Sequence, residues 1–214
     1  MEQILLFYLT FAVAVASPGP ANFAMMHTAL EQGRFNGMAL ALGVWTGSIT
    51  WGLSTSLGLS AIMQKSPIIF DILLLAGGSY MFYMGFNSAK QVINLKGNNS
   101  SSPANDNAPV KSPIKQYIRG LLIHLTNPKA ATVWLTIVLY GTTMAEENGT
   151  DLVIFILPCF AIAAMVMSGY VLFFSSRPMI ALYARVRKPF TLTTAAFFIG
   201  AGLFMLYSAW EAFR

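Results

Sequence analysis

Charged side chains are scarce in this sequence. Only 21 of its 214 residues, or 10%, are Asp, Glu, Lys or Arg, whereas a soluble globular domain carries about 25%. Hydrophobic residues make up 56% of the chain, and its mean hydropathy is +0.61. Since a membrane-spanning helix needs about 20 mostly apolar residues, this share is enough for six spans. The composition therefore excludes a soluble globular domain, a disordered chain and a nucleic-acid-binding protein, and it predicts a protein embedded in a lipid bilayer.

The residues needed for several other kinds of chemistry are also missing. The single cysteine, Cys159, excludes an internal disulfide and a thiolate metal cluster. The motifs HExxH, GxSxG and the Walker type, which mark metalloproteases, hydrolases and nucleotide-binding loops, do not occur. We therefore expect no catalytic residue, no metal site and no cofactor.

Six apolar, charge-poor segments predict transmembrane helices. Their expected ranges are 4–28, 38–62, 68–90, 117–142, 151–174 and 190–211. The stretch 96–116 is rich in Asn, Ser and Pro, which is typical of a flexible linker. It divides the chain into two groups of three helices, 1–95 and 117–214. Five spans, with the first or last helix lost or re-entrant, is the main alternative.

The first apolar segment resembles a signal peptide in one respect, because residues 14–16 (AVA) have the small-x-small pattern of a cleavage site. The residues before them, however, include Glu2 and no Lys or Arg, and apolar sequence resumes over 21–30. We therefore expect a first membrane helix.

The distribution of basic residues predicts the orientation. Ten of the 13 Lys and Arg residues fall on one side of the expected helices, namely Arg34, Lys90, Lys96, Lys111, Lys115, Arg119, Arg177, Arg185, Arg187 and Lys188. The other side holds only Lys65 and Arg214. Because cytoplasmic loops of membrane proteins are enriched in Lys and Arg, the linker 96–116 is expected in the cytoplasm and both termini outside it.

The two halves show signs of an internal repeat. At a constant offset of 124 residues, the third helix aligns with the sixth through Gly78, Tyr80, Met81, Tyr83 and Phe86 against Gly202, Phe204, Met205, Tyr207 and Trp210. The first and fourth helices share a proline-centred break inside an apolar span. Since each half has three helices, the halves must enter the membrane from opposite sides, as in many secondary transporters. The sequence predicts an all-α membrane protein with six transmembrane helices in two inverted three-helix repeats.

The breaks are candidates for a binding site. The residues that carry them are Pro18, Gly19, Pro20 and Asn22 in the first half and Asn127 and Pro128 in the second. Proline has no backbone N–H, and carbonyls freed inside a bilayer must be satisfied by neighbours, water or a ligand. One proline would indicate a simple kink. Two prolines around a glycine, with a counterpart in the other half, favour a site lined by broken helices.

Lys129 directly follows the second break. It lies ten residues after Arg119, which places it about 15 Å from the cytoplasmic edge at 1.5 Å per residue, near the centre of a core about 30 Å thick. A charge at that depth is by default a functional-site hypothesis. The alternative is a lysine that snorkels or rests against carbonyls freed by Pro128.

Acidic residues are expected only in loops or near helix ends. They are Glu2, Glu31, Asp71, Asp106, Glu146, Glu147, Asp151 and Glu211. Lys129 therefore lacks an obvious counter-ion, so either a substrate carboxylate completes the pair or the amine carries a proton during the cycle. A dibasic amino acid or polyamine would call for an acidic partner inside the membrane, so the sequence favours a neutral zwitterion.

The second expected helix has small residues four apart. Ala39, Gly43 and Gly47 predict close packing with another helix, and Ser48 beside them is a candidate for polar lining. His27 and His124 lie near cytoplasmic helix ends and are expected to be interfacial polar residues.

Four segments resemble one known family, the LysE/RhtB-type amino-acid exporters of bacterial inner membranes. They are SPGPANFAMMHTALEQGRFNGMALALGVWTG (17–47), AGGSYMFYMGFNSAK (76–90), GLLIHLTNPKA (120–130) and IGAGLFMLYSAW (199–210). The first is similar to the family's Pro-Gly-Pro motif with its Gly-Arg-x-x-Gly turn and Gly-x-x-x-Gly helix, and the third to its NPKA motif. The resemblance covers essentially the whole chain.

The resemblance implies a multi-pass secondary transporter of the inner membrane, not an enzyme. With the orientation that the basic residues predict, both termini would lie in the periplasm. The transporter would export neutral amino acids or close derivatives, such as threonine, homoserine, homoserine lactone or branched-chain amino acids, with the proton as coupling ion. A homodimer is left open. The site residues implied by the matching motifs are Pro18, Gly19, Pro20, Asn22, Asn127, Pro128 and Lys129.

The chain departs from the family pattern at two places. Ser48 stands where many members have an acidic residue, which bears on proton coupling or on binding of the substrate ammonium. The segment 131–141 lacks the Phe-rich stretch often found after NPKA.

Two other functions remain as alternatives. Efflux of an inorganic cation would need clustered intramembrane carboxylates, His or Cys. A non-transporting membrane scaffold would use the small-residue helix faces for assembly.

Overall fold

The computed structural model describes residues 2–17, 19–59, 68–95 and 112–212, and within these the chain is helical and contains no strand. The elements are α1 (Glu2–Ala16), α2 (Pro20–Ser54), the π-helix η1 (Thr55–Leu59), α4 (Ile68–Leu95), α5 (Pro113–Leu125), α6 (Pro128–Asn148), α7 (Leu152–Phe174) and α8 (Arg177–Ala212). The predicted all-α class is therefore confirmed for the described residues.

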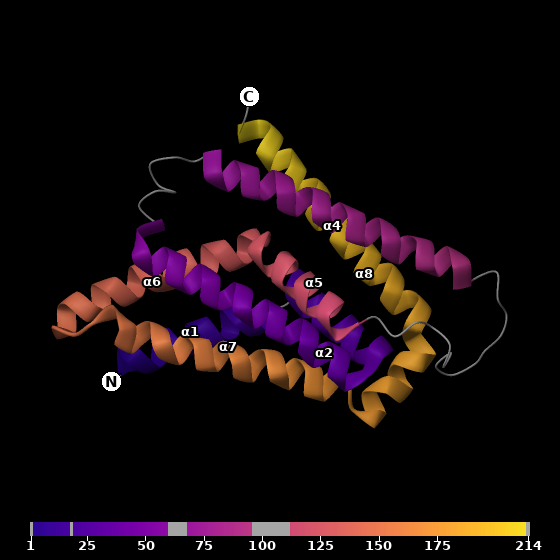
Figure 1. The fold of residues 1–214 in the computed structure, drawn as a ribbon, viewed down its shortest axis with the longest axis horizontal. Coiled ribbons are helices and arrows are strands. Elements are labelled where there is room, and N and C mark those ends of the chain that lie inside the picture. Colours follow the sequence, from indigo (N-terminus) through magenta and orange to yellow (C-terminus); the bar gives the residue numbers. More distant parts are fainter. Residues whose placement is uncertain (1, 18, 60–67, 96–111, 213–214) are drawn as a thin grey trace.

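The helices form two groups (Figure 1). α1, α2, α5, α6 and α7 pack into one bundle, and α4 and α8 cross each other as a pair beside it. The largest fully buried side chains of the bundle come from different helices and include Phe7, Phe11, Trp134 and Val171. Helices distant in sequence are thus held together by one apolar core.

The connection between the first two predicted helices, 29–37, is a one-residue turn at Gly33. Helix α2 runs on both sides of Gly33, whose φ of 78° and ψ of −178° are not helical. A Cβ at Gly37 would lie 3.2 Å from the Ala29 Cα, although eight residues of a continuous helix span about 12 Å. The chain therefore reverses at Gly33, and α2 is a hairpin of two arms, 20–32 and 34–54. Glycine suits this position since a positive φ strains residues with a Cβ.

Several other predicted boundaries differ from the observed ones. The fourth predicted helix, 117–142, is two helices, α5 and α6, separated at Thr126 and Asn127. The sixth begins at Arg177, because Pro189 is accommodated inside α8 and does not end the helix. α5 already starts at Pro113, within the predicted linker, of which 96–111 lies outside the described residues. The end of the second predicted helix, 60–62, also lies outside them.

Two helices in the described part of the chain, Leu152–Phe174 and Lys188–Glu211, are long and apolar enough to cross a membrane. A third candidate is the pair Glu2–Ala16 and Pro20–Gly58, which are bent by 59° at the break between them.

Helices α4 and α8 approach each other closely through glycine. A Cβ at Gly78 would lie 3.0 Å from Leu206 Cγ, and one at Gly202 would lie 2.7 Å from the backbone nitrogen of Phe82. Gly78 and Gly202 are 124 residues apart in sequence, and so are Phe82 and Leu206. The contact is therefore reciprocal, because each glycine faces the residue that lies four positions after the other glycine.

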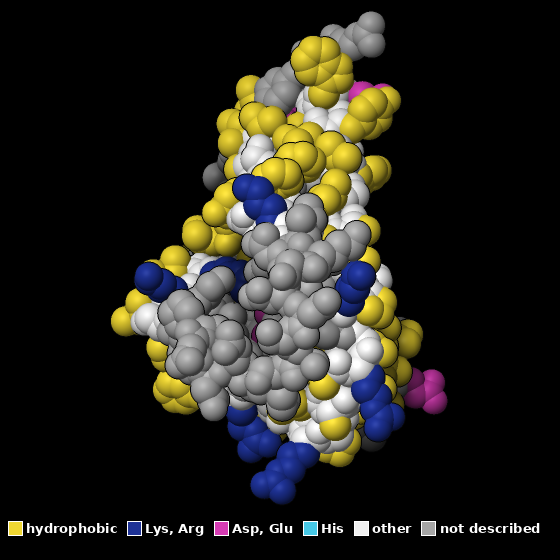
Figure 2. Space-filling model, turned by 90° about the vertical axis from the view of Figure 1, so that its right-hand side faces the viewer, with side chains coloured by type: hydrophobic (Ala, Val, Ile, Leu, Met, Phe, Trp, Pro, Cys, Tyr) yellow, Lys and Arg dark blue, Asp and Glu magenta, His cyan; other side chains and the backbone are white. Residues whose placement is uncertain are grey.

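Basic side chains gather at one end of the molecule. Figure 2 looks at the right-hand side of Figure 1, where α4 ends and α5 begins, and shows several Lys and Arg side chains on that face. Few acidic side chains are visible on it.

Alanine at two neighbouring glycines of α8 tests the α4–α8 contact. In Gly202→Ala the new methyl group meets the Phe82 backbone, so the helices must separate, and overpacking of this kind costs about 1–3 kcal/mol. Nothing lies within 4 Å of a Cβ at Gly200, so Gly200→Ala should stabilise by up to about 1 kcal/mol through helix propensity. Thermal unfolding of the detergent-solubilised protein should show midpoints shifted in opposite directions; equal midpoints would contradict the contact.

Candidate functional site

The break between α1 and α2 leaves the last carbonyls of α1 without helical donors. Proline at positions 18 and 20 cannot donate to the carbonyls of Ala14 and Ala16, four residues earlier. Ser17 Oγ instead donates to the Ala14 carbonyl at 2.9 Å. Pro18 itself lies outside the described residues.

Two side chains from other turns satisfy the remaining carbonyls at the end of α1. The Asn22 amide nitrogen lies 3.0, 3.3 and 3.2 Å from the carbonyl oxygens of Val15, Ala16 and Ser17. The Tyr170 hydroxyl of α7 donates to the Ala16 carbonyl at 2.6 Å. Asn22, which the sequence placed in the candidate site, thus ties the two sides of the break together.

The second break is closed in a similar way. Pro128 cannot donate to the His124 carbonyl, which instead accepts from the Trp51 indole nitrogen at 3.3 Å and from the Asn127 backbone at 3.2 Å. Asn127 is the N-cap of α6, and its side-chain oxygen accepts from the Lys129 N–H at 3.1 Å. α6 therefore starts afresh at Pro128, at the break that the sequence predicts.

Lys129 joins the two breaks. Its Nζ donates to the Ser17 carbonyl at 2.6 Å and to Ser17 Oγ at 2.7 Å. A cation at the carboxyl end of a helix is stabilised by the helix dipole. Of the two sequence-based alternatives, the lysine does rest on a freed carbonyl, but on one at the end of α1 and not on one freed by Pro128. No ion pair with a carboxylate is found for it in the described part of the chain.

Gly19 permits this approach. A Cβ at Gly19 would lie 3.2 Å from Cδ and 3.3 Å from Nζ of Lys129. A larger residue there would push the lysine side chain away from the end of α1.

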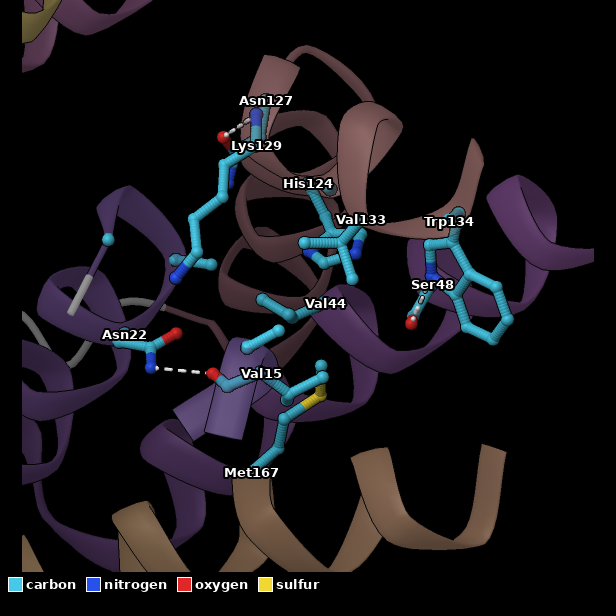
Figure 3. Close-up of a pocket in the computed structure, with 14 residues that line it drawn as sticks. Val15, Asn22, Val44, Ser48, His124, Asn127, Lys129, Val133, Trp134 and Met167 are labelled. Atoms are coloured by element: carbon cyan, nitrogen blue, oxygen red, sulfur yellow. Dashed lines mark hydrogen bonds between the residues drawn. The ribbon is translucent and has the colours of Figure 1, made fainter. Parts of the chain in front are cut away.

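A cavity lies where the breaks meet (Figure 3). It contains about 430 Å³ of space not filled by protein atoms, part of which is open to the outside. The residues that line it are Ala14, Val15, Gly19, Ala21, Asn22, Val44, Ser48, His124, Asn127, Lys129, Ala130, Val133, Trp134 and Met167. The predicted residues among them are Gly19, Asn22, Asn127 and Lys129, together with Ser48 as the predicted polar lining. Pro20 and Pro128 are next to lining residues in sequence but do not line the cavity themselves.

The sequence of this chain matches one known protein family over most of its length. The sequence profile of the LysE type translocators matches residues 12–209, which include both breaks and the cavity. The chain belongs to the LysE type translocator family.

Relatives of this translocator include transport proteins of bacteria. The threonine efflux protein of Escherichia coli K12 is 34% identical over 131 residues, 59% of this chain and 62% of that protein. A leucine efflux protein of Enterobacter is 28% identical over 155 residues, 72% of this chain and 71% of that protein. The alignment with the threonine efflux protein thus spans about three fifths of its length.

Similarity over nearly the full chain is found with a Bacillus subtilis membrane protein of unassigned function. It is 26% identical over 207 residues, 95% of this chain and 98% of that protein. No solved structure matches the translocator.

Ser48 lines the translocator's cavity, and its hydroxyl group is already hydrogen-bonded within the protein. Its Oγ is buried and accepts a hydrogen bond from the Trp134 indole nitrogen at 3.0 Å. Sequence reasoning missed Trp134, because a tryptophan in an apolar segment carries no sign of its partner.

Both histidines are buried within the protein. His27 is buried beside Glu31, with 3.6 Å between Nε2 and the carboxylate. His124 lines the cavity with 8% of its surface exposed. The break after Leu125 places the end of α5 against the cavity.

Removing the Tyr170 hydroxyl tests whether freed carbonyls need their donors. Tyr170→Phe should lower the stability of the translocator by about 1 kcal/mol, the usual worth of a hydrogen bond between membrane helices, because the Ala16 carbonyl loses its shortest partner. Tyr207→Phe is the matched control, since its hydroxyl bonds an exposed Glu211 one turn away. Unfolding midpoints in detergent measure both, and equal losses would show that the Ala16 carbonyl needs its donor no more than the exposed Glu211 does.

Proposed function

We propose that this translocator exports neutral amino acids or close derivatives across the bacterial inner membrane in exchange for protons. The observation that carries the proposal is the meeting of the two broken-helix motifs at a cavity whose cation, Lys129, is bonded only to Ser17 among the described residues. The printed functions of two relatives, threonine efflux and leucine efflux, support the substrate class.

The substrate carboxylate would bind at Lys129. The ammonium is held by a neutral carbonyl and a hydroxyl, so an incoming carboxylate offers it a stronger, charge-assisted partner. Helices α2 and α6 both begin at the cavity, at Gly19 and Asn127. The amino ends of helices favour anions, and half-helices with this orientation bind substrate carboxylates in other secondary transporters.

The charge of the cavity favours a zwitterion over a cation. No Asp or Glu is among the described residues that line it. Its remaining lining is mostly apolar, which suits a small neutral side chain. Efflux of a metal cation has less support, since the described residues contain no group of three or more His, Cys, Asp or Glu that could hold a metal ion. No observation favours a scaffold role.

We further propose six spans in two inverted repeats, 1–95 and 117–214, joined by a cytoplasmic linker. The reciprocal contact of Gly78 and Gly202 supports this, because a two-fold axis brings equivalent residues into reciprocal contact. The basic end in Figure 2 would face the cytoplasm, with both termini in the periplasm. Rocking of one repeat against the other would expose the cavity to each side in turn.

Replacing Lys129 tests the proposed site. Lys129→Met should abolish export of labelled threonine, leucine and related neutral amino acids from vesicles containing the purified protein, because the carboxylate loses its cation. Lys115→Met is the control: it removes an exposed lysine of α5, and its flux should stay at the wild-type level.

The same vesicles test the coupling ion. Collapsing the pH gradient should stop uphill export by the wild-type protein. Undiminished flux in Lys129→Met would contradict binding of the substrate carboxylate by the lysine. Export that does not depend on the pH gradient would contradict proton exchange.

A further inference from the structure

His124 is a buried polar residue that the fold leaves without a partner. Its side chain lines the cavity with 8% of the residue exposed. Neither Nδ1 nor Nε2 has a hydrogen-bond partner among the described residues. Buried polar groups in proteins are almost always hydrogen-bonded, so the two enclosed nitrogens lack the partner that such groups normally have.

The surroundings hold the imidazole in place. The His124 carbonyl accepts from Trp51, and a Cβ at Gly47 would lie 2.9 Å from the His124 Cβ. In Figure 3 the ring lies near Val44 and Val133, which offer it no polar atom. Lys129 is the only other ionisable side chain in the cavity lining of the described chain, and its ammonium is bonded at Ser17.

We propose that His124 binds a hydroxyl group on the substrate side chain, so that the preferred substrates are neutral amino acids with a hydroxyl, such as threonine or homoserine. This inference rests on the proposed function, in which Lys129 binds the carboxylate. A neutral imidazole has one donor and one acceptor nitrogen, and a hydroxyl group likewise donates and accepts. Substrate and residue therefore satisfy each other in a cavity whose other walls are largely apolar.

An unpaired imidazole also works against aliphatic substrates. A purely apolar pocket rejects an added hydroxyl only weakly, whereas a site built to bond a hydroxyl strongly rejects the analogue that lacks it. A bound valine or leucine would leave both His124 nitrogens buried without partners. His124 thus determines specificity between the two substrate types named for the relatives, threonine and leucine.

Threonine and valine provide the test, because they differ by a hydroxyl in place of a methyl group. Export of each labelled amino acid is measured from vesicles containing the wild type, His124→Leu or His124→Gln. The wild type should export threonine at least about tenfold more efficiently than valine, as kcat/KM, the factor expected for one lost hydrogen bond. His124→Leu should bring the ratio close to one, and His124→Gln, which keeps a donor and an acceptor, should retain most of the preference.

A second readout needs no variant. The chain has only two histidines, so the ring ¹⁵N signals of His124 can be followed in the wild-type protein by NMR, with His27 as internal control. Threonine should shift the His124 signals and valine should leave them unchanged.

Equal export of threonine and valine by the wild type, an unchanged ratio in His124→Leu, or His124 signals that ignore threonine would each overturn the inference. In those cases Lys129-dependent export would still stand. Failure of the wild type to export any neutral amino acid would overturn the proposed function, and the inference with it.

Discussion

The structure depends on one constraint: a carbonyl freed by proline inside a membrane helix must find another donor, because hydrocarbon offers none. Pro158 lies inside α7 and cannot donate to the carbonyl of Ile154, four residues earlier, which accepts from the Tyr8 hydroxyl of α1 at 3.2 Å. Tyr170 does the same for Ala16, and Trp51 for His124. Each of these bonds links two helices, so the prolines that interrupt individual helices also specify which helices pack together.

The same constraint explains how a lysine can remain in this environment. The end of α1 presents carbonyls that no helical N–H can reach, and Lys129 donates to one of them across the cavity. A cation and an open helix end, each costly by itself, satisfy each other. The pairing uses no carboxylate, so in the proposed function a substrate carboxylate could replace Ser17 without leaving a buried anion behind.

The positions of the helix breaks and of the lysine beside the second break can be predicted from the sequence. Pro18, Pro20 and Pro128 predict where the helices break, and the position of Lys129 predicts a buried cation beside the second break. The side chains that donate to the freed carbonyls cannot be predicted in this way. Tyr170 lies 154 residues from Ala16, and nothing in the local sequence marks a tyrosine as the partner of that carbonyl. Long-range packing decides those contacts.

The surroundings of His124 and the turn at Gly33 are not predicted by the local sequence. On a straight helix His124 would lie nearer the cytoplasmic edge than Lys129, but the break at Asn127 brings both residues to one cavity. The gap between the first two predicted helices, 29–37, is in the structure a turn at Gly33 alone, since helical conformation extends further on both sides than the polar residues indicate. In both cases backbone geometry at a single break or turn decides where side chains lie.

The central claim is that Lys129, held at the meeting point of the two breaks, binds the substrate carboxylate. Equilibrium binding to the purified protein tests it most directly, with threonine compared with threoninol, in which an alcohol replaces the carboxylate. The account predicts that the wild type binds threonine at least about tenfold more tightly, the worth of one charge-assisted hydrogen bond, and that Lys129→Met loses this difference. Equal affinities in the wild type, or a difference that persists in Lys129→Met, would contradict it.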